Sequence, residues 1–94
     1  MALFVFQGLD KAGALEVRKA TREAHLAWIA ALNPRVKIGG PMLSDDGATP
    51  VGSMLVVEAD TLVDAKALFA LDPYALAGLW QSTSVRPYNW LIKQ

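Results

Sequence analysis

The order of the predicted elements constrains the fold of this chain more than any other feature of its sequence. Two segments are rich in helix-forming residues, 14–32 and 62–71. They are flanked and separated by segments of apolar, β-branched and aromatic residues, which are typical of short strands. We predict strands over residues 2–7, over 35–38 with an extension to Leu43 left open, over 52–59 and over 80–88. The order is therefore strand, helix, strand, strand, helix, strand.

Turn and cap residues support these boundaries. Asn33-Pro34 ends the first helix, because the residue before a proline is disfavoured in the α region. Asp60-Thr61 is suited to cap the second helix, and Asp72-Pro73 to open a short helical piece. A βαββαβ order is that of a ferredoxin-like α+β fold, in which helices cover one face of an antiparallel sheet.

Length and apolar content bear on how the chain assembles. A chain of 94 residues has room for one domain, which we predict to span residues 1–94. Because 53% of the residues are hydrophobic, we expect apolar surface to remain after this small domain has folded. The sheet face without helices needs a cover, and the candidates are a second subunit, a ligand or water. A subunit interface is the natural place for the remaining apolar surface.

Charge and cysteine content exclude several classes of function. Nine basic residues balance nine acidic ones, which gives no basic field for nucleic acid. Cysteine is absent, so we expect no disulfide, thiolate nucleophile or cysteine-ligated metal, and the chain fits a reducing cytoplasm. The apolar start lacks a basic leader and soon reaches Gln7 and Asp10, so we expect neither a signal peptide nor a membrane span.

The first helix carries basic residues on its apolar side. At about 100° per residue, five residues share a stripe roughly 80° wide. Polar groups on an inner face need partners, because an unpaired buried charge is costly. A helix that only packed against a core would place leucine at the polar positions. The stripe consists of Leu15, Arg18, Arg22, His25 and Ile29.

Simpler interpretations of these residues stay open. Arginine stems often lie along apolar surface with the charged group in water, and a single histidine is more often a packed residue than a catalyst. Asp72 before proline is explained by helix capping alone, and Ser44 by its place in a turn. As the one histidine of the chain, His25 has no second imidazole with which to bind a metal. We expect neither a metal nor a cofactor.

Four groups of residues, taken in order, resemble the YCII-related family over nearly the whole chain. The combination of Asp-Pro-aromatic, Ala-Gly and a strand that ends in Pro-aromatic is the specific part. The residues are Arg18-x3-Arg22-x2-His25-Leu26, Gly40-Pro41, Asp72-Pro73-Tyr74-x2-Ala77-Gly78-Leu79 and Val85-x-Pro87-Tyr88.

This resemblance implies a ferredoxin-like fold that dimerises through its sheets into an α/β barrel. It also implies an active site centred on a histidine of the first helix and an aspartate after the second, which match His25 and Asp72. Arg18 and Arg22 precede His25 by about two turns and one turn, where they could bind a substrate carboxylate or stabilise an oxyanion. Ser44 could offer a hydroxyl and ranks last among these candidates.

Two functions follow as hypotheses. The first is an enzyme that uses His25 and Asp72 for general acid–base chemistry on a small anionic metabolite, as a lyase, isomerase or hydrolase. The second is a non-enzymatic ligand-binding or regulatory module, in which Arg18 and Arg22 hold the ligand and Asp72 is merely a cap. In a third interpretation, His25 and Asp72 only stabilise the fold.

Overall fold

A computed structural model describes all residues, 1–94. Its element order confirms the predicted βαββαβ arrangement, including the short helical piece predicted to begin at Asp72-Pro73 before the last strand. None of the helices is both long and apolar enough to cross a lipid bilayer. The elements are β1 (Ala2–Asp10), α1 (Leu15–Ala31), β2 (Val36–Leu43), β3 (Pro50–Ala59), α2 (Leu62–Ala70), α3 (Pro73–Leu76) and β4 (Trp80–Tyr88).

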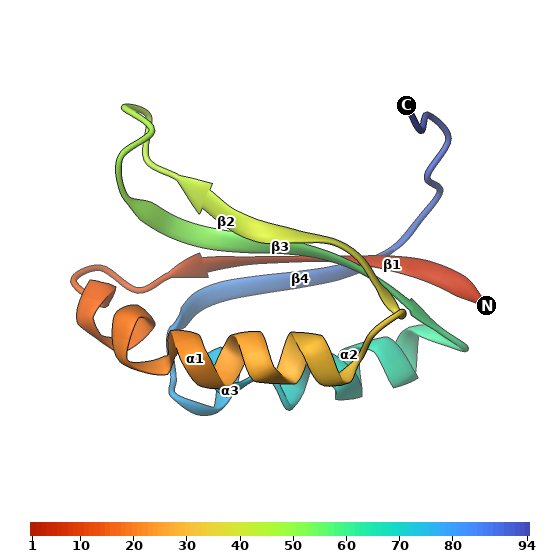
Figure 1. Ribbon diagram of the computed structural model, residues 1–94, viewed down its shortest axis with the longest axis horizontal. Coiled ribbons are helices and arrows are strands. Elements are labelled where there is room, and N and C mark those ends of the chain that lie inside the picture. Colours follow the sequence, from red (N-terminus) through yellow and green to blue (C-terminus); the bar gives the residue numbers. More distant parts are fainter.

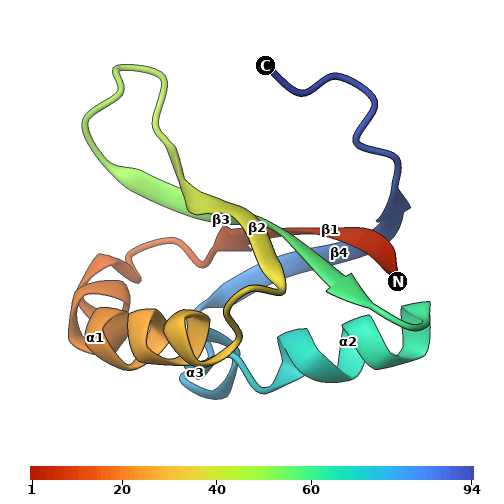
Figure 2. The same cartoon turned by 45° about the vertical axis from the view of Figure 1, so that its right-hand side comes forward.

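The four strands form one antiparallel sheet in the order β2-β3-β1-β4. The two central strands are β1 and β3, with Phe4 opposite Val57 and Phe6 opposite Leu55. All three helices lie on one face of the sheet, as Figure 1 shows. The β2–β3 hairpin and the C-terminal segment bend away on the opposite side (Figures 1 and 2). The predicted ferredoxin-like α+β class is confirmed.

Some strands are longer than the sequence predicts. β1 runs through Gly8 to Asp10, and β2 includes the extension through Gly39 to Leu43. A Cβ at Gly8 would lie 2.8 Å from ring atoms of Trp80, and one at Gly39 would lie 2.6 Å from Leu55. Both glycines therefore permit close packing inside a strand, beyond the predicted end of the first strand at residue 7 and of the second at residue 38.

The apolar core lies between the central strands and α2. Phe4, Phe6 and Val57 point to this side of the sheet and are buried. From α2, Phe69 stacks on Phe6 with ring centroids 4.8 Å apart, and Ala65 allows close approach. Burial of such side chains is the main source of stability in a domain of this size.

Caps begin the second and third helices as predicted. The Thr61 hydroxyl accepts a hydrogen bond of 3.1 Å from the Asp64 backbone N–H. The Asp72 carboxylate accepts one of 2.9 Å from the Tyr74 backbone N–H, with Pro73 as the first helical residue. Each cap satisfies a backbone donor that the helix itself leaves unpaired. The second of these caps fixes where the Asp72 side chain lies.

A candidate active site beneath the first helix

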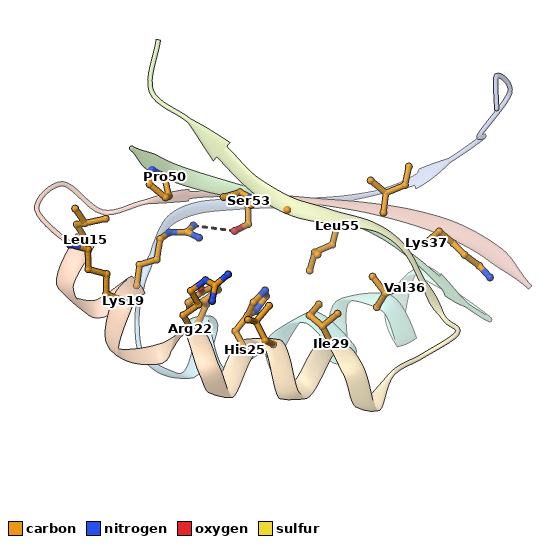
Figure 3. A pocket seen from close by; sticks show the side chains of 17 residues that line it. Leu15, Lys19, Arg22, His25, Ile29, Val36, Lys37, Pro50, Ser53 and Leu55 are labelled. Atoms are coloured by element: carbon orange, nitrogen blue, oxygen red, sulfur yellow. Dashed lines mark hydrogen bonds between the residues drawn. The ribbon is translucent and has the colours of Figure 1, made fainter. Parts of the chain in front are cut away.

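A cavity of about 330 Å³ lies between α1 and the strands β2 and β3. Figure 3 shows Arg22, His25 and Ile29 pointing from α1 toward the sheet, across from Ser53 and Leu55 of β3. The polar stripe of α1 therefore faces a cavity, as its spacing indicates. The polar residues that line the cavity are Arg18, Lys19, Arg22, His25, Lys37, Ser53 and Tyr74.

His25 and Asp72 form a buried pair. The distance from His25 Nδ1 to Asp72 Oδ1 is 2.8 Å, and the two residues are 8% and 1% exposed. A carboxylate can only accept a hydrogen bond, so His25 Nδ1 donates the proton in this contact. Nε2 of the neutral ring is then an acceptor, and it has no partner within the chain.

Asp72 combines the two interpretations that the sequence left open. Its Oδ1 accepts hydrogen bonds from both the His25 ring and the Tyr74 backbone, so the residue is a helix cap and a histidine partner at once. Its Oδ2 is buried without any partner. Leaving half a carboxylate unpaired costs stability, so capping alone does not account for this residue. No third His, Cys, Asp or Glu joins the pair into a cluster suited to a metal ion.

Arg18 is bound to Asp10 and is not a free cation. Its Nε and Nη2 donate to the two Asp10 carboxylate oxygens, each at 2.8 Å, and Nη2 also donates to the Ser53 hydroxyl at 3.0 Å. Burial opposes the charge, but Asp10 outweighs it and holds the pKa of Arg18 above its ordinary value. Arg18 is therefore a fixed positive group whose charge is largely neutralised by Asp10.

Arg22 and Lys19 supply the available positive charge. Both line the cavity and are exposed, and Arg22 forms no ion pair within the chain. Lys19 approaches Glu16 at 3.8 Å, a surface contact that holds it only weakly. Arg22 lies one turn before His25 on the same side of α1, and Figure 3 shows the two side chains next to each other.

Ser44 lies apart from these residues. It occupies the turn between β2 and β3, where its hydroxyl donates to Asp46 Oδ1 at 2.6 Å and accepts from the Thr49 backbone at 3.2 Å. It is not among the residues that line the cavity. The geometry gives a turn-forming role to Ser44 and no support to the predicted role in substrate binding.

Three residues of the site were missed by the sequence analysis: Asp10, Ser53 and Tyr74. Ser53 is a polar residue on the helix side of a buried strand, and that position was the available signal. Asp10 ends β1 and lies beyond the predicted end of that strand at residue 7. Tyr74 follows the Asp-Pro cap and was noted only as part of a motif. Its ring stacks on His25, with centroids 4.1 Å apart and planes 21° apart.

Comparison with known proteins shows which family the chain resembles. The family model described as the YCII-related domain matches residues 2–89. The protein YciI of Escherichia coli is 37% identical over 94 residues, covering 93% of this chain and 96% of its own length.

Two solved structures are similar in fold. The 5-chloro-2-hydroxyhydroquinone dehydrochlorinase TftG of Burkholderia phenoliruptrix, in complex with 2,5-dihydroxybenzoquinone, superposes with a TM-score of 0.84, 32% identity and 93% coverage of both chains. A putative antibiotic biosynthesis monooxygenase of Nitrosomonas europaea superposes with a TM-score of 0.56, covering 98% of this chain and all of its own, at 21% identity. The second shares the fold alone. The first has a small-molecule enzyme activity in its name. By its sequence and its fold, the chain belongs to the YCII-related family.

Proposed function

We propose that this chain is an enzyme in which His25, oriented by Asp72, moves a proton on a small anionic metabolite. The reaction class is elimination, isomerisation or hydrolysis. The observation that carries the proposal is the 2.8 Å contact between His25 Nδ1 and Asp72 Oδ1 at the wall of a cavity, which leaves Nε2 without a partner. A histidine in this arrangement is a general base and, once protonated, a general acid.

The buried carboxylate supports this chemistry in two ways. Its hydrogen bond holds the His25 ring in one tautomer and one orientation, with Nε2 as the basic nitrogen. When Nε2 accepts a proton, the ring becomes an imidazolium, and the negative charge of Asp72 stabilises it in surroundings where water cannot. The pair returns to its starting state when the proton is given to the leaving group or to another atom of the substrate.

The charges at the cavity favour an anionic substrate. Among the cations that line the cavity, Arg18 is paired with Asp10 and Lys37 with Glu58 at 3.0 Å, which leaves Arg22 and Lys19. Arg22 adjoins His25. A guanidinium binds a carboxylate or an oxyanion with paired hydrogen bonds. A volume of about 330 Å³ suits a metabolite with a single ring. The similar structure of TftG, whose name gives a chlorinated hydroquinone as substrate, supports the same size and class.

We further propose that a second copy of the chain covers the open face of the sheet, which gives a homodimer. The centre of this face is apolar, with Val5 opposite Val56, and Leu9 at its edge is half exposed. In the C-terminal segment, Leu91 and Ile92 are exposed as well. A dimer would bury the exposed side chains among these, Leu9, Leu91 and Ile92, whereas Val56 is already buried within the chain. A cytoplasmic location stays a prediction, which cell fractionation can test.

Two substitutions at the pair test the enzymatic proposal. Asp72→Asn keeps an amide oxygen that caps α3 but removes the negative charge, and His25→Gln removes the base. We expect a fall in kcat of about 10²–10⁴-fold for each, measured on 5-chloro-2-hydroxyhydroquinone as the probe substrate. Both variants should still sediment as folded dimers.

The matched control is Asp64→Asn, because Asp64 is an exposed carboxylate in the first turn of α2, away from the cavity. It should keep wild-type turnover. If both pair variants turned over the probe at the wild-type rate, the proposed mechanism would be wrong. If the wild type bound 2,5-dihydroxybenzoquinone but changed none of the tested hydroquinones, and binding were lost in Arg22→Met, a binding module would be the better description.

A further inference from the structure

Tyr74 is fixed beside the proposed base. The residue is 2% exposed, and its ring stacks on His25 at 4.1 Å. The edge of Trp80 packs against it at 5.7 Å, and the Arg18 guanidinium lies 4.9 Å from the ring centroid. Packing on these sides leaves the ring little freedom to move. The phenol therefore has a defined place in the lining of the cavity.

The phenolic proton of Tyr74 has no acceptor within the chain. A buried tyrosine hydroxyl normally has one. Both Asp10 oxygens accept from Arg18, and Asp72 Oδ1 accepts from His25 and a backbone N–H. Asp72 Oδ2 makes no hydrogen bond to any group of the chain, Tyr74 included. Arg18 offers only donors, so a contact with it uses the phenol oxygen and leaves the proton free.

Tyr74 is one of the residues that line the cavity. The atoms that are fully buried and unpartnered are Asp72 Oδ2 and Trp80 Nε1. The Tyr74 hydroxyl is not among these atoms. Since Tyr74 lines the cavity and its ring faces are covered by neighbours, the cavity is the place from which an acceptor can approach.

We propose that the Tyr74 hydroxyl donates a hydrogen bond to the substrate oxygen that becomes negative when His25 removes a proton. This inference rests on the proposed function and adds a second substrate-contacting group to it. The substrate class it specifies is a planar compound with a carbonyl or phenol oxygen next to the acidic position. Tyr74 and His25 then act on neighbouring atoms of one ring.

The step balances without any further reactant. His25 Nε2 takes a proton from a carbon next to a carbonyl or, in the keto tautomer of a hydroquinone, from a remaining ring hydroxyl. The electron pair of the broken C–H or O–H bond leaves a negative enolate oxygen on the substrate. Tyr74 donates a hydrogen bond to this oxygen and keeps its own proton. In an elimination, the enolate re-forms the carbonyl as the leaving group departs with its bonding pair. In an isomerisation, His25 returns the proton to another carbon.

Electrostatics agree with a donor role. Burial raises the pKa of Tyr74 above its ordinary value, although Arg18 and Arg22 act in the opposite direction. The phenol is therefore protonated at neutral pH and remains a donor. Arg22, which forms no ion pair within the chain, favours a negative oxygen beside it. A preorganised donor of this kind, aimed at a developing charge, is worth about 10²–10³-fold in kcat.

The test is Tyr74→Phe, which keeps the stacked ring and removes only the hydroxyl. We expect kcat on 5-chloro-2-hydroxyhydroquinone to fall about 10²-fold while KM changes little, since the hydrogen bond strengthens as charge develops. The affinity for 2,5-dihydroxybenzoquinone should fall about tenfold if one hydrogen bond is lost. The melting temperature should stay at the wild-type value. The control is Tyr88→Phe, at the exposed end of β4.

The outcomes separate this inference from the function on which it rests. Loss of turnover in both Tyr74→Phe and His25→Gln, with Tyr88→Phe unchanged, supports it. Wild-type kcat and affinity in Tyr74→Phe, with His25→Gln inactive, overturn the role of Tyr74 and leave the acid–base pair standing. Equal turnover by His25→Gln and wild type overturns the proposed function itself. Absence of binding by the wild type overturns the substrate class and the assignment of Tyr74 with it.

Discussion

The space beneath the sheet divides into two halves of opposite character. Under α2 the side chains are apolar, with Phe69 stacked on Phe6 at 4.8 Å. Under α1 and α3 lie all the buried polar residues that the structure contains, which are Arg18, His25, Ser53 and Asp72. The first half packs its aromatic rings together and is bordered by a hollow of about 640 Å³ between α2 and β4, whereas the second contains the cavity of about 330 Å³ that the polar side chains line.

This difference suggests that the half beneath α2 serves mainly stability and the half beneath α1 mainly function. The half beneath α2 gains free energy from apolar burial. The half beneath α1 places charges and an unpaired carboxylate oxygen away from water, which opposes folding. A chain selected only for stability would make the second half like the first. The presence of Asp72 and His25 in this half therefore favours a functional role for them. Substitutions in the two halves should differ in their effects on stability and on ligand binding.

The largest effect on stability is expected in the apolar half. Phe69→Ala removes a buried aromatic ring and should lower the free energy of unfolding by about 4 kcal/mol, as measured by chemical denaturation. Val63→Ala on the same helix is the control, because Val63 is 75% exposed and its loss should cost less than about 0.5 kcal/mol. Affinity for 2,5-dihydroxybenzoquinone, per folded molecule, should not change in either variant. A loss of affinity in Phe69→Ala as large as that in Tyr74→Phe would mean that the halves are not independent.

A smaller effect on stability, joined to an effect on ligand binding, is expected in the polar half. Asp10→Asn leaves the buried Arg18 guanidinium without its carboxylate, which should cost about 3 kcal/mol of unfolding free energy. Because Arg18 lies against the Tyr74 ring, its release should also change ligand affinity. Glu16→Gln is the control, since the contact of Glu16 with Lys19 is long and exposed. Equal stability of Asp10→Asn and Glu16→Gln would show that the Arg18 pair contributes nothing to the fold.

Much of this division could be predicted from the sequence, because periodicity reports which face of an element is buried. The stripe that holds Arg18, Arg22 and His25 on the inner side of α1 was predicted from spacing alone, and these residues do line the cavity. The element order and the caps were predicted equally well. Strand ends were not, because Gly8 and Gly39 resemble turn residues until the side chains packed over them are known.

The partners of the polar residues could not be predicted. Spacing placed Arg18 and Arg22 on one stripe but could not distinguish the arginine that Asp10 neutralises from the one that is free. That distinction depends on where a strand end meets a helix, which no local pattern encodes. The same holds for the stacking of Tyr74 on His25, which requires α3 to lie against α1.

The smallest effect compares the two tyrosines of the chain. Tyr74 is buried in the polar half and its pKa is raised mainly by burial, whereas Tyr88 lies at the exposed end of β4. Following tyrosinate absorbance in Tyr88→Phe, which leaves Tyr74 as the one tyrosine, should show Tyr74 ionising above its ordinary pKa. Since the folded state holds this proton more tightly than the unfolded state, the resulting stabilisation is complete below pH about 10, the ordinary tyrosine value. It is lost as the pH rises through the folded pKa. Wild-type stability should therefore fall more steeply in that range than the stability of Tyr74→Phe. If stability fell equally with pH in the wild type and in Tyr74→Phe, burial would not raise the pKa of the Tyr74 hydroxyl. The proposal that burial keeps this hydroxyl protonated as a donor would then be wrong.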